Sequence, residues 1–161
     1  MANSYNVFFL QLQQELAVAR TLHRLLCEER ELLDPPNIQA LTDLQQEKLE
    51  RLNALKELST QRCNLLTELH IPLDKHCYLS PKLQSDDASD NIRLAEVWQE
   101  LADQFEQNRR LTEVLATIVL TARQRTQSLM KILRGKKNTP NLYTKSGQTQ
   151  SGSEGLGYAK A

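Results

Sequence analysis

Glycine is missing from most of this sequence. The chain has 161 residues, and its five glycines all lie in the last 27 positions, so the first 134 contain none. Phosphate-binding loops and nucleophile elbows need glycine where the backbone turns sharply or approaches a ligand closely. The absence excludes these motifs from the first 134 residues, and we expect the protein not to be an enzyme.

Aromatic residues, prolines and cysteines are also scarce. The three cysteines, Cys27, Cys63 and Cys77, form no C-x-x-C pair and no even disulfide set. No run approaches 18 consecutive apolar residues, and the N-terminus lacks the basic start of a signal peptide. We therefore expect a reduced, cytoplasmic protein without direct membrane insertion.

Leucine, by contrast, accounts for 29 of the 161 residues, and glutamine and glutamate are also frequent. Such a composition, with few glycines and prolines to form turns, favours helices, since a sheet protein needs more β-branched and aromatic residues. We predict an all-α fold, an antiparallel bundle of three long helices with an extended third helix and a disordered C-terminal tail.

Apolar residues recur at helical spacing in three segments, residues 4–33, 37–69 and 90–134. Asp34-Pro35-Pro36 ends the first segment, because consecutive prolines cannot continue a helix. Asn37 is the expected N-cap of the second helix, and Ser89 or Asp90 that of the third. Residues 70–89 form the connector. The predicted domains are thus a helical bundle over 1–134 and a flexible tail over 135–161, which is too polar and glycine-rich to fold alone.

The helix order predicts where the single tryptophan lies. In an up-down-up bundle, the first and third helices begin at the same end. Trp98 and the segment from Phe8 to Leu12 each lie about two turns into their helices. We therefore expect Trp98 to lie beside Phe8, Phe9 and Leu12, and Trp98 and Phe105 to belong to the core.

The third helix is too long for its neighbours. At about 1.5 Å per residue it spans about 65 Å, against about 45–50 Å for the other two. Its last three turns, from about Leu120 to Arg134, are then left without a partner although they are apolar. An unpaired apolar helix end favours binding to another protein chain.

Charge is distributed unevenly between the two parts of the neutral chain. Residues 1–90 carry nine basic and fourteen acidic side chains, whereas residues 91–161 carry eleven and six. The second half of the third helix carries six basic side chains: Arg109, Arg110, Arg123, Arg125, Lys131 and Arg134. No aromatic residue interleaves this run, so a charged rim around a protein-binding stripe is favoured over a nucleic-acid site.

Three other sites deserve weighing. His70, His76 and Cys77 could hold a metal, but no second ligand cluster exists, and ordinary connector residues are favoured. His23 could belong to a phosphotransfer module, although bulky leucines surround it. Six glutamates could be imagined as a carboxylate site: Glu28, Glu29, Glu31, Glu47, Glu50 and Glu57. Because no Glu-x-x-His motif occurs, we assign them to a solvated face instead. We expect no metal and no other cofactor.

The segment after the third helix carries a more specific pattern, Thr139-Pro140-Asn141-Leu142-Tyr143-Thr144-Lys145-Ser146-Gly147-Gln148-Thr149. A Pro-x-Leu-Tyr-x-x-x-Gly-Gln pattern behind a long helix, in a short Leu- and Gln-rich chain, resembles the FlgN family of cytosolic chaperones of flagellar export. The resemblance covers overall length, helix layout and this segment.

The resemblance implies two binding regions. Family members bind the hook-filament junction proteins FlgK and FlgL through the end of their last helix and deliver them to the type III export gate. The implied client-binding residues are Leu111, Val114, Leu115, Ile118, Val119, Ala122, Leu129, Ile132 and Leu133. Docking on the cytoplasmic domain of the gate protein FlhA is implied for Leu142, Tyr143, Gly147 and Gln148. The alternative is a helical scaffold that self-associates through the same helix.

Overall fold

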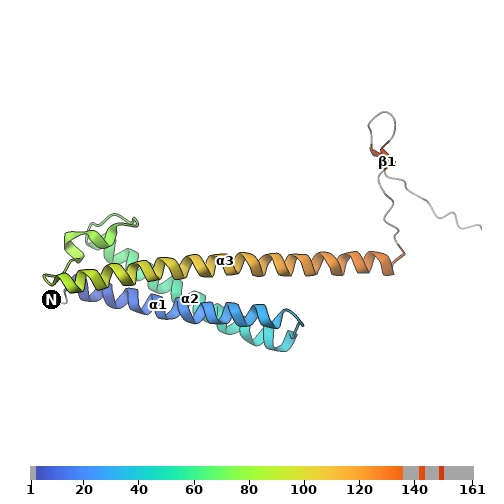
Figure 1. Ribbon diagram of the computed structural model, residues 1–161, viewed down its shortest axis with the longest axis horizontal. Coiled ribbons are helices and arrows are strands. Elements are labelled where there is room, and N and C mark those ends of the chain that lie inside the picture. Colours follow the sequence, from blue (N-terminus) through green and yellow to red (C-terminus); the bar gives the residue numbers. More distant parts are fainter. Residues whose placement is uncertain (1–2, 136–141, 144–148, 151–161) are drawn as a thin grey trace, which may run out of the picture. The chain divides into compact units, whose positions relative to one another are not determined.

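The computed structural model describes residues 3–135, 142–143 and 149–150 (Figure 1). Its elements in chain order are α1 (Ser4–Leu32), α2 (Ile38–Glu68), the 3-10 turns η1 (Cys77–Leu79) and η2 (Pro81–Leu83), α3 (Ala88–Leu133), β1 (Leu142–Tyr143) and β2 (Thr149–Gln150). The prediction of an all-α bundle of three long helices is confirmed.

Polar side chains cap the helices at their N-termini. Asn37 caps α2 as predicted, with its Oδ1 accepting a hydrogen bond from the Ala40 backbone N–H at 3.1 Å. The prediction for α3 is wrong, because the helix begins at Ala88 and the capping side chain is Asp87. Its Oδ1 accepts from the Ser89 backbone N–H at 2.8 Å and from the Ser89 hydroxyl. Several adjacent Ser and Asp residues can cap a helix, so composition alone did not select between them.

The C-terminus of α2 ends in a Schellman motif. The backbone N–H of His70 donates to the Thr67 carbonyl, and that of Ile71 donates to the Leu66 carbonyl. His70 has φ of +55°, the left-handed conformation that this motif requires at that position. Ile71 and Leu66 are both buried in the core, so they form the apolar contact that accompanies the motif.

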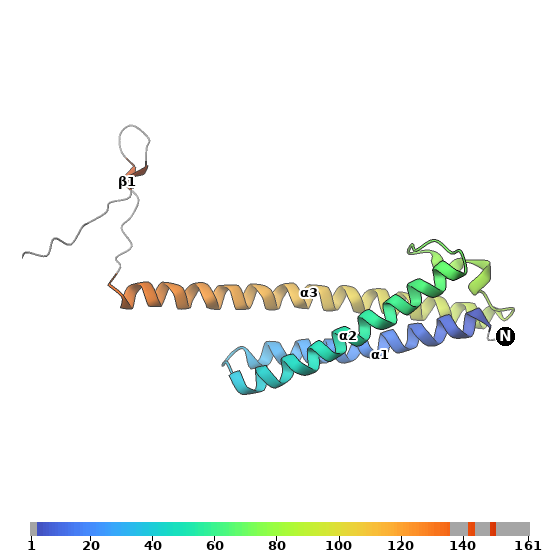
Figure 2. The ribbon, with the colours of Figure 1, turned by 180° about the vertical axis from the view of Figure 1, so that it is seen from behind.

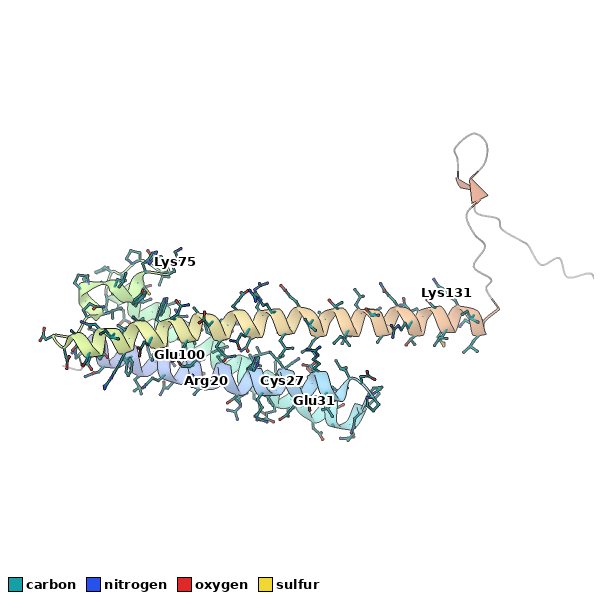
Figure 3. The ribbon with its side chains drawn as sticks, viewed as in Figure 1. Arg20, Cys27, Glu31, Lys75, Glu100 and Lys131 are labelled. Carbon is teal, nitrogen blue, oxygen red and sulfur yellow. The ribbon has the colours of Figure 1, made fainter. Side chains whose placement is uncertain are left out.

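Cross-helix contacts establish the up-down-up order (Figure 2). Along α1, Glu15 pairs with Arg62 and the later Glu29 pairs with the earlier Lys48, so α2 runs antiparallel to α1. The Phe8 and Trp98 rings lie 6.1 Å apart near the start of α1 and α3. The expected proximity of Trp98 to Phe8 is therefore confirmed. Figure 3 labels Arg20 and Glu100, which form an ion pair between α1 and α3.

Two groups of buried side chains form the core of the bundle. The larger contains Phe8, Leu12 and Leu16 of α1, with buried residues from α2, the connector and α3. The smaller consists of Leu22, Leu26 and Leu115. Trp98 packs against the larger group without being fully buried, and its Nε1–H donates to the Lys75 carbonyl at 3.1 Å. The connector is thereby attached to α3.

The chain divides into two compact units, residues 1–117 and 118–161. The buried residues of the core all belong to the first unit. In the second, every side chain from 119 to 133 is exposed.

β1 and β2 pair antiparallel, with Leu142 opposite Gln150 and Tyr143 opposite Thr149, where the sequence predicts no strand. The rest of the predicted flexible tail lies outside the described residues. In the parts of the chain that the structure describes, no helix has the length and apolar character needed to cross a membrane.

Candidate functional site

The end of α3 carries several large apolar side chains that are exposed. Leu129, Ile132 and Leu133 have exposed fractions of 60, 68 and 81%. Ile118, Ala122, Leu129 and Ile132 follow at intervals of four, seven and three residues, which places them on one side of the helix. We call these four residues the α3 apolar row. Leu129 and Ile132 also line a surface depression of 480 Å³ together with Thr121, Gln124, Arg125 and Ser128.

A seven-residue repeat explains the direction of this row. The buried side chains of α3 are Leu94, Leu101, Asn108 and Leu115, spaced seven residues apart. The same spacing continues to Ala122 and Leu129, which are exposed. A seven-residue repeat drifts only about 20° per step around an α-helix. Two steps separate Leu115 from Leu129, so the apolar row lies within about 40° of the side on which Leu115 packs against Leu22 and Leu26.

Two of the predicted client-binding residues lie in the bundle. Leu115 is buried against Leu22 and Leu26, and Leu111 packs against the same group. They are not open to another chain in this structure, so we leave them out of the proposed client surface. Ile118 is half-buried, and the other predicted residues are exposed: Val114, Val119, Ala122, Leu129, Ile132 and Leu133.

The basic rim is smaller than the sequence predicts. Arg109 pairs with Glu106 and Glu113, and Arg110 Nε lies 2.9 Å from Glu106 Oε1. Hydrogen bonds from the two arginines lower the pKa of Glu106 to about 2. Beyond Glu113, the helix contains no acidic residue up to Leu133. Four exposed cations remain in this stretch: Arg123, Arg125, Lys131 and Arg134. At about 100° per residue, only Arg125 lies on the side of the apolar row, where it also lines the depression, and the other three lie on the opposite side of the helix.

The predicted gate-docking segment falls partly on described residues. Leu142 and Tyr143 form β1, whose backbone pairs with Thr149 and Gln150 in β2. Gly147 and Gln148 lie outside the described residues.

The sequence model of the family described as FlgN protein matches residues 1–151, which include the bundle, the apolar row and the β1–β2 segment. The chain belongs to the FlgN family. No curated protein and no solved structure matches it. Membership assigns the chain to the chaperones of flagellar assembly, which act on protein clients and are not an enzyme family.

The connector histidines of this FlgN-family chain, His70 and His76, take part in local backbone structure. His70 occupies the left-handed position of the Schellman motif, and the backbone N–H of His76 donates to Asp74 Oδ1 at 2.8 Å. Cys77 is buried in the core, and burial raises the pKa of its thiol. Among the described residues, no three His, Cys, Asp or Glu side chains gather in a way that could hold a metal ion.

Two glutamates of α1, Glu15 and Glu29, are buried. Glu15 has no exposed surface, and its carboxylate accepts hydrogen bonds from Arg62 Nε at 2.7 Å and from Ser59 Oγ at 3.2 Å. Glu29 is buried beside Lys48 Nζ at 2.8 Å and Gln45 Nε2 at 2.8 Å. The solvated-face prediction is therefore wrong for Glu29. For both glutamates, partners on α2 compensate the cost of burial.

Arg62 links all three helices of the FlgN-family bundle. Its guanidinium carbon lies 5.6 Å from the centre of the Trp98 ring, a cation–π distance, while its Nε bonds to Glu15. Arg62 and Trp98 also line a cavity of 190 Å³ with Leu101, Ala102 and Phe105. No local sequence pattern indicates the role of Arg62, since its partners are 36 or more positions away along the chain.

Proposed function

We propose that this chain captures hook-filament junction proteins of the FlgK and FlgL type on the α3 apolar row and delivers them to the type III export gate in the cytoplasm. The observation that carries the proposal is the apolar row itself. Large aliphatic side chains seldom remain exposed together on one side of a helix without a binding partner.

An amphipathic helical segment is the client structure that this surface suits. Such a segment presents apolar residues at spacings of three and four, which match the spacing of the row. Burial of apolar area contributes about 25 cal/mol per Å² before the costs of association. An aggregation-prone apolar segment of a client would thereby be kept from water before export.

The four exposed cations between residues 123 and 134 would favour an acidic client. Because no acidic residue lies between Glu113 and Leu133, the field around the row has one sign over that stretch. Complementary charge mainly accelerates encounter and sets specificity, and added salt screens it. Client association should therefore slow as ionic strength rises.

Replacing Leu129 and Ile132 together with Asp tests client capture. We expect the affinity for the C-terminal segment of a junction protein to fall at least about ten-fold, since two apolar contacts are replaced by charges that must be desolvated. Isothermal titration measures the affinity, and far-UV circular dichroism reports whether helicity persists. Gln127→Asp is the matched control, because it adds a charge to the same two turns on the opposite side of the helix. Equal affinity of the double variant and the control would contradict the assignment.

We further propose that Leu142, Tyr143, Gly147 and Gln148 dock on the cytoplasmic domain of FlhA. A tyrosine offers a large rigid face and a hydroxyl with little loss of side-chain entropy, which suits a short docking segment. The family match includes this segment and ends at residue 151.

Tyr143→Ala should weaken binding to the gate domain about ten-fold, or ~1.4 kcal/mol, with client affinity unchanged. Tyr158→Ala is the matched control, since Tyr158 lies beyond the family match in the same C-terminal region. Titration of each variant with the gate domain and with the client segment gives the comparison. A normal gate titration of Tyr143→Ala, or a simultaneous loss of client binding, would show that the two tasks are not divided in this way.

Self-association through the apolar row is the second candidate, because the same exposed leucines and isoleucines would suit a second copy of the chain. Mass in solution separates the two. A chaperone should show a change of mass with client, whereas a scaffold should self-associate without client and lose this association in the Leu129→Asp, Ile132→Asp double variant.

A further inference from the structure

Three polar side chains of the bundle form a hydrogen-bonded row that has no part in client capture. Cys27 Sγ lies 3.7 Å from His23 Nε2, one turn earlier on α1. His23 Nδ1 lies 3.0 Å from Asn108 Oδ1 on α3. The thiol is exposed, the imidazole is half-buried and the amide is buried. We infer that Cys27 is a nucleophilic thiol that exchanges with small-molecule disulfides, with His23 as its base and Asn108 as the residue that positions the imidazole.

The bonding of Asn108 determines which nitrogen of His23 carries the proton. Asn108 Nδ2 donates to the Ala19 backbone carbonyl at 2.9 Å, which fixes the orientation of the amide. Its Oδ1 also accepts from Gln104 Nε2 at 3.1 Å. An amide oxygen only accepts hydrogen bonds, so in the neutral ring His23 Nδ1 carries the hydrogen. Nε2 then has a free lone pair directed at the Cys27 thiol.

A nucleophile, a base beside it and a third group that orients the base form the arrangement that activates cysteine. The surrounding structure limits what the thiol can do. Cys27 lies inside α1 (Ser4–Leu32), where backbone N–H groups donate to carbonyls of the preceding turn. No pair of them is available to stabilise an oxyanion, so thiol exchange is favoured over acyl transfer.

The exchange step balances without any further reactant. The Cys27 thiol proton passes to His23 Nε2, and Sγ attacks one sulfur of the small disulfide. A bond forms between Sγ and that sulfur, and the original sulfur–sulfur bond breaks. The departing thiolate takes up the proton from His23. The products are a mixed disulfide on Cys27 and one free small thiol, and excess thiol reverses the reaction.

The other two cysteines provide internal references. Cys63 is half-buried and Cys77 is buried, and burial raises the pKa of the Cys77 thiol. Neither forms a hydrogen bond with a histidine among the described residues. The inference therefore predicts a ranking of three thiols in one chain, which a single experiment can measure.

The experiment incubates the full-length chain with oxidised glutathione at neutral pH, stops the reaction with acid and quantifies each cysteine peptide by mass spectrometry. We expect Cys27 to form the mixed disulfide about ten-fold faster than Cys63, since His23 can take up the thiol proton as Sγ attacks. His23→Gln should lower the Cys27 rate to that of Cys63. His76→Gln, which removes an imidazole from the connector, should leave the Cys27 rate unchanged. In urea the advantage of Cys27 should disappear.

Equal rates for Cys27 and Cys63 in the folded chain would overturn the inference, and so would an unchanged Cys27 rate in His23→Gln. The unmodified protein supplies a test that needs no variant. Nitrogen-15 chemical shifts should place the proton of the neutral His23 ring on Nδ1, and Asn108→Ala should move part of it to Nε2. A wild-type ring protonated on Nε2 would show that His23 cannot act as the base.

Discussion

At the scale of single residues, the buried polar contacts separate what sequence patterns can predict from what they cannot. Glu15 is three residues after Leu12 and four before Ala19, so it lies within the apolar stripe of α1. This spacing could have predicted that the Glu15 side chain is buried. Its partner Arg62 has no such signal, because nothing in the α2 sequence indicates which side faces Glu15. Local periodicity predicts burial, whereas pairing depends on the packing of two helices.

Asn108 offers a second example at this scale. It occupies the seven-residue row of Leu94, Leu101 and Leu115, where a polar residue interrupts an apolar series. A single polar residue in such a row commonly fixes the register of neighbouring helices at a cost in stability. Its hydrogen bonds to Ala19 and His23 of α1 supply that register here. The interruption could be read from the sequence, but the partners could not.

Breaking the Glu15–Arg62 pair should be more harmful than removing it entirely. Glu15→Leu should lower the free energy of unfolding by about 3 kcal/mol, because the Arg62 cation then remains largely buried without its partner. The double change Glu15→Leu with Arg62→Met should cost much less, since apolar residues of similar size replace both charges. Urea denaturation of the two variants measures the difference. A double variant less stable than Glu15→Leu alone would contradict this account.

At the scale of elements, helix existence and order followed from the sequence, whereas exact ends and side-chain accessibility did not. The predicted segments 4–33, 37–69 and 90–134 differ by at most two residues from the observed bounds. Proline and asparagine signals fixed the α1–α2 boundary, since each acts through the local backbone. The use of Leu111 and Leu115 in the core was missed, because the resemblance to a family assigns a binding region without the packing of this bundle.

The position of Trp98 could be predicted from the sequence, but the extent of its burial could not. The sequence places it at the correct end of the bundle, beside Phe8. It is only half-buried, with stacking contacts to Phe8 and Tyr78. The connector that carries Tyr78 reads as irregular in sequence, so its packing over α3 could not be predicted.

The α3 cap should make stability depend on pH. Hydrogen bonds from the Ser89 backbone N–H and hydroxyl lower the pKa of Asp87 below its ordinary 3.8. A carboxyl with a lowered pKa in the folded state contributes stability above its unfolded pKa, and that contribution is lost as the pH falls through the folded pKa. Asp87→Asn keeps a capping acceptor that does not titrate.

We therefore expect wild type to exceed Asp87→Asn in melting temperature at neutral pH and to lose this advantage as the pH falls below 3.8. Thermal melts between pH 2 and pH 7 measure it. Asp86→Asn removes a neighbouring carboxylate but keeps the cap, so its difference in melting temperature from wild type should change less over this range. A difference between wild type and Asp87→Asn that stays constant across this range would argue against the cap.

At the scale of the whole molecule, stability and binding belong to different parts of the chain. All buried core residues lie between Tyr5 and Leu115, within the unit of residues 1–117. The apolar row belongs to residues 118–133. The uneven charge of the sequence follows a similar division, with the acidic excess in residues 1–90.

A chain that ends after Thr117 should retain the melting temperature of the full chain within about 4 °C, the shift that roughly 1 kcal/mol produces in a domain of this size. Its Trp98 fluorescence should be unchanged, because all ring partners of Trp98 are retained. The truncated chain should not bind client. A larger drop in melting temperature, or a loss of cooperative unfolding, would show that residues 118–161 contribute to the core.

The continuity of α3 also has a kinetic meaning. Starting a new helix is unfavourable by a factor of about a thousand, whereas lengthening an existing one is nearly neutral. Residues 118–133 continue a helix that already began at Ala88, so their helical turns need no nucleation of their own. Their amide hydrogens should exchange with solvent progressively faster from Ile118 towards Leu133, as turns fray from one end only. A client would then meet turns that are already wound, and binding should slow this exchange most at the last turns.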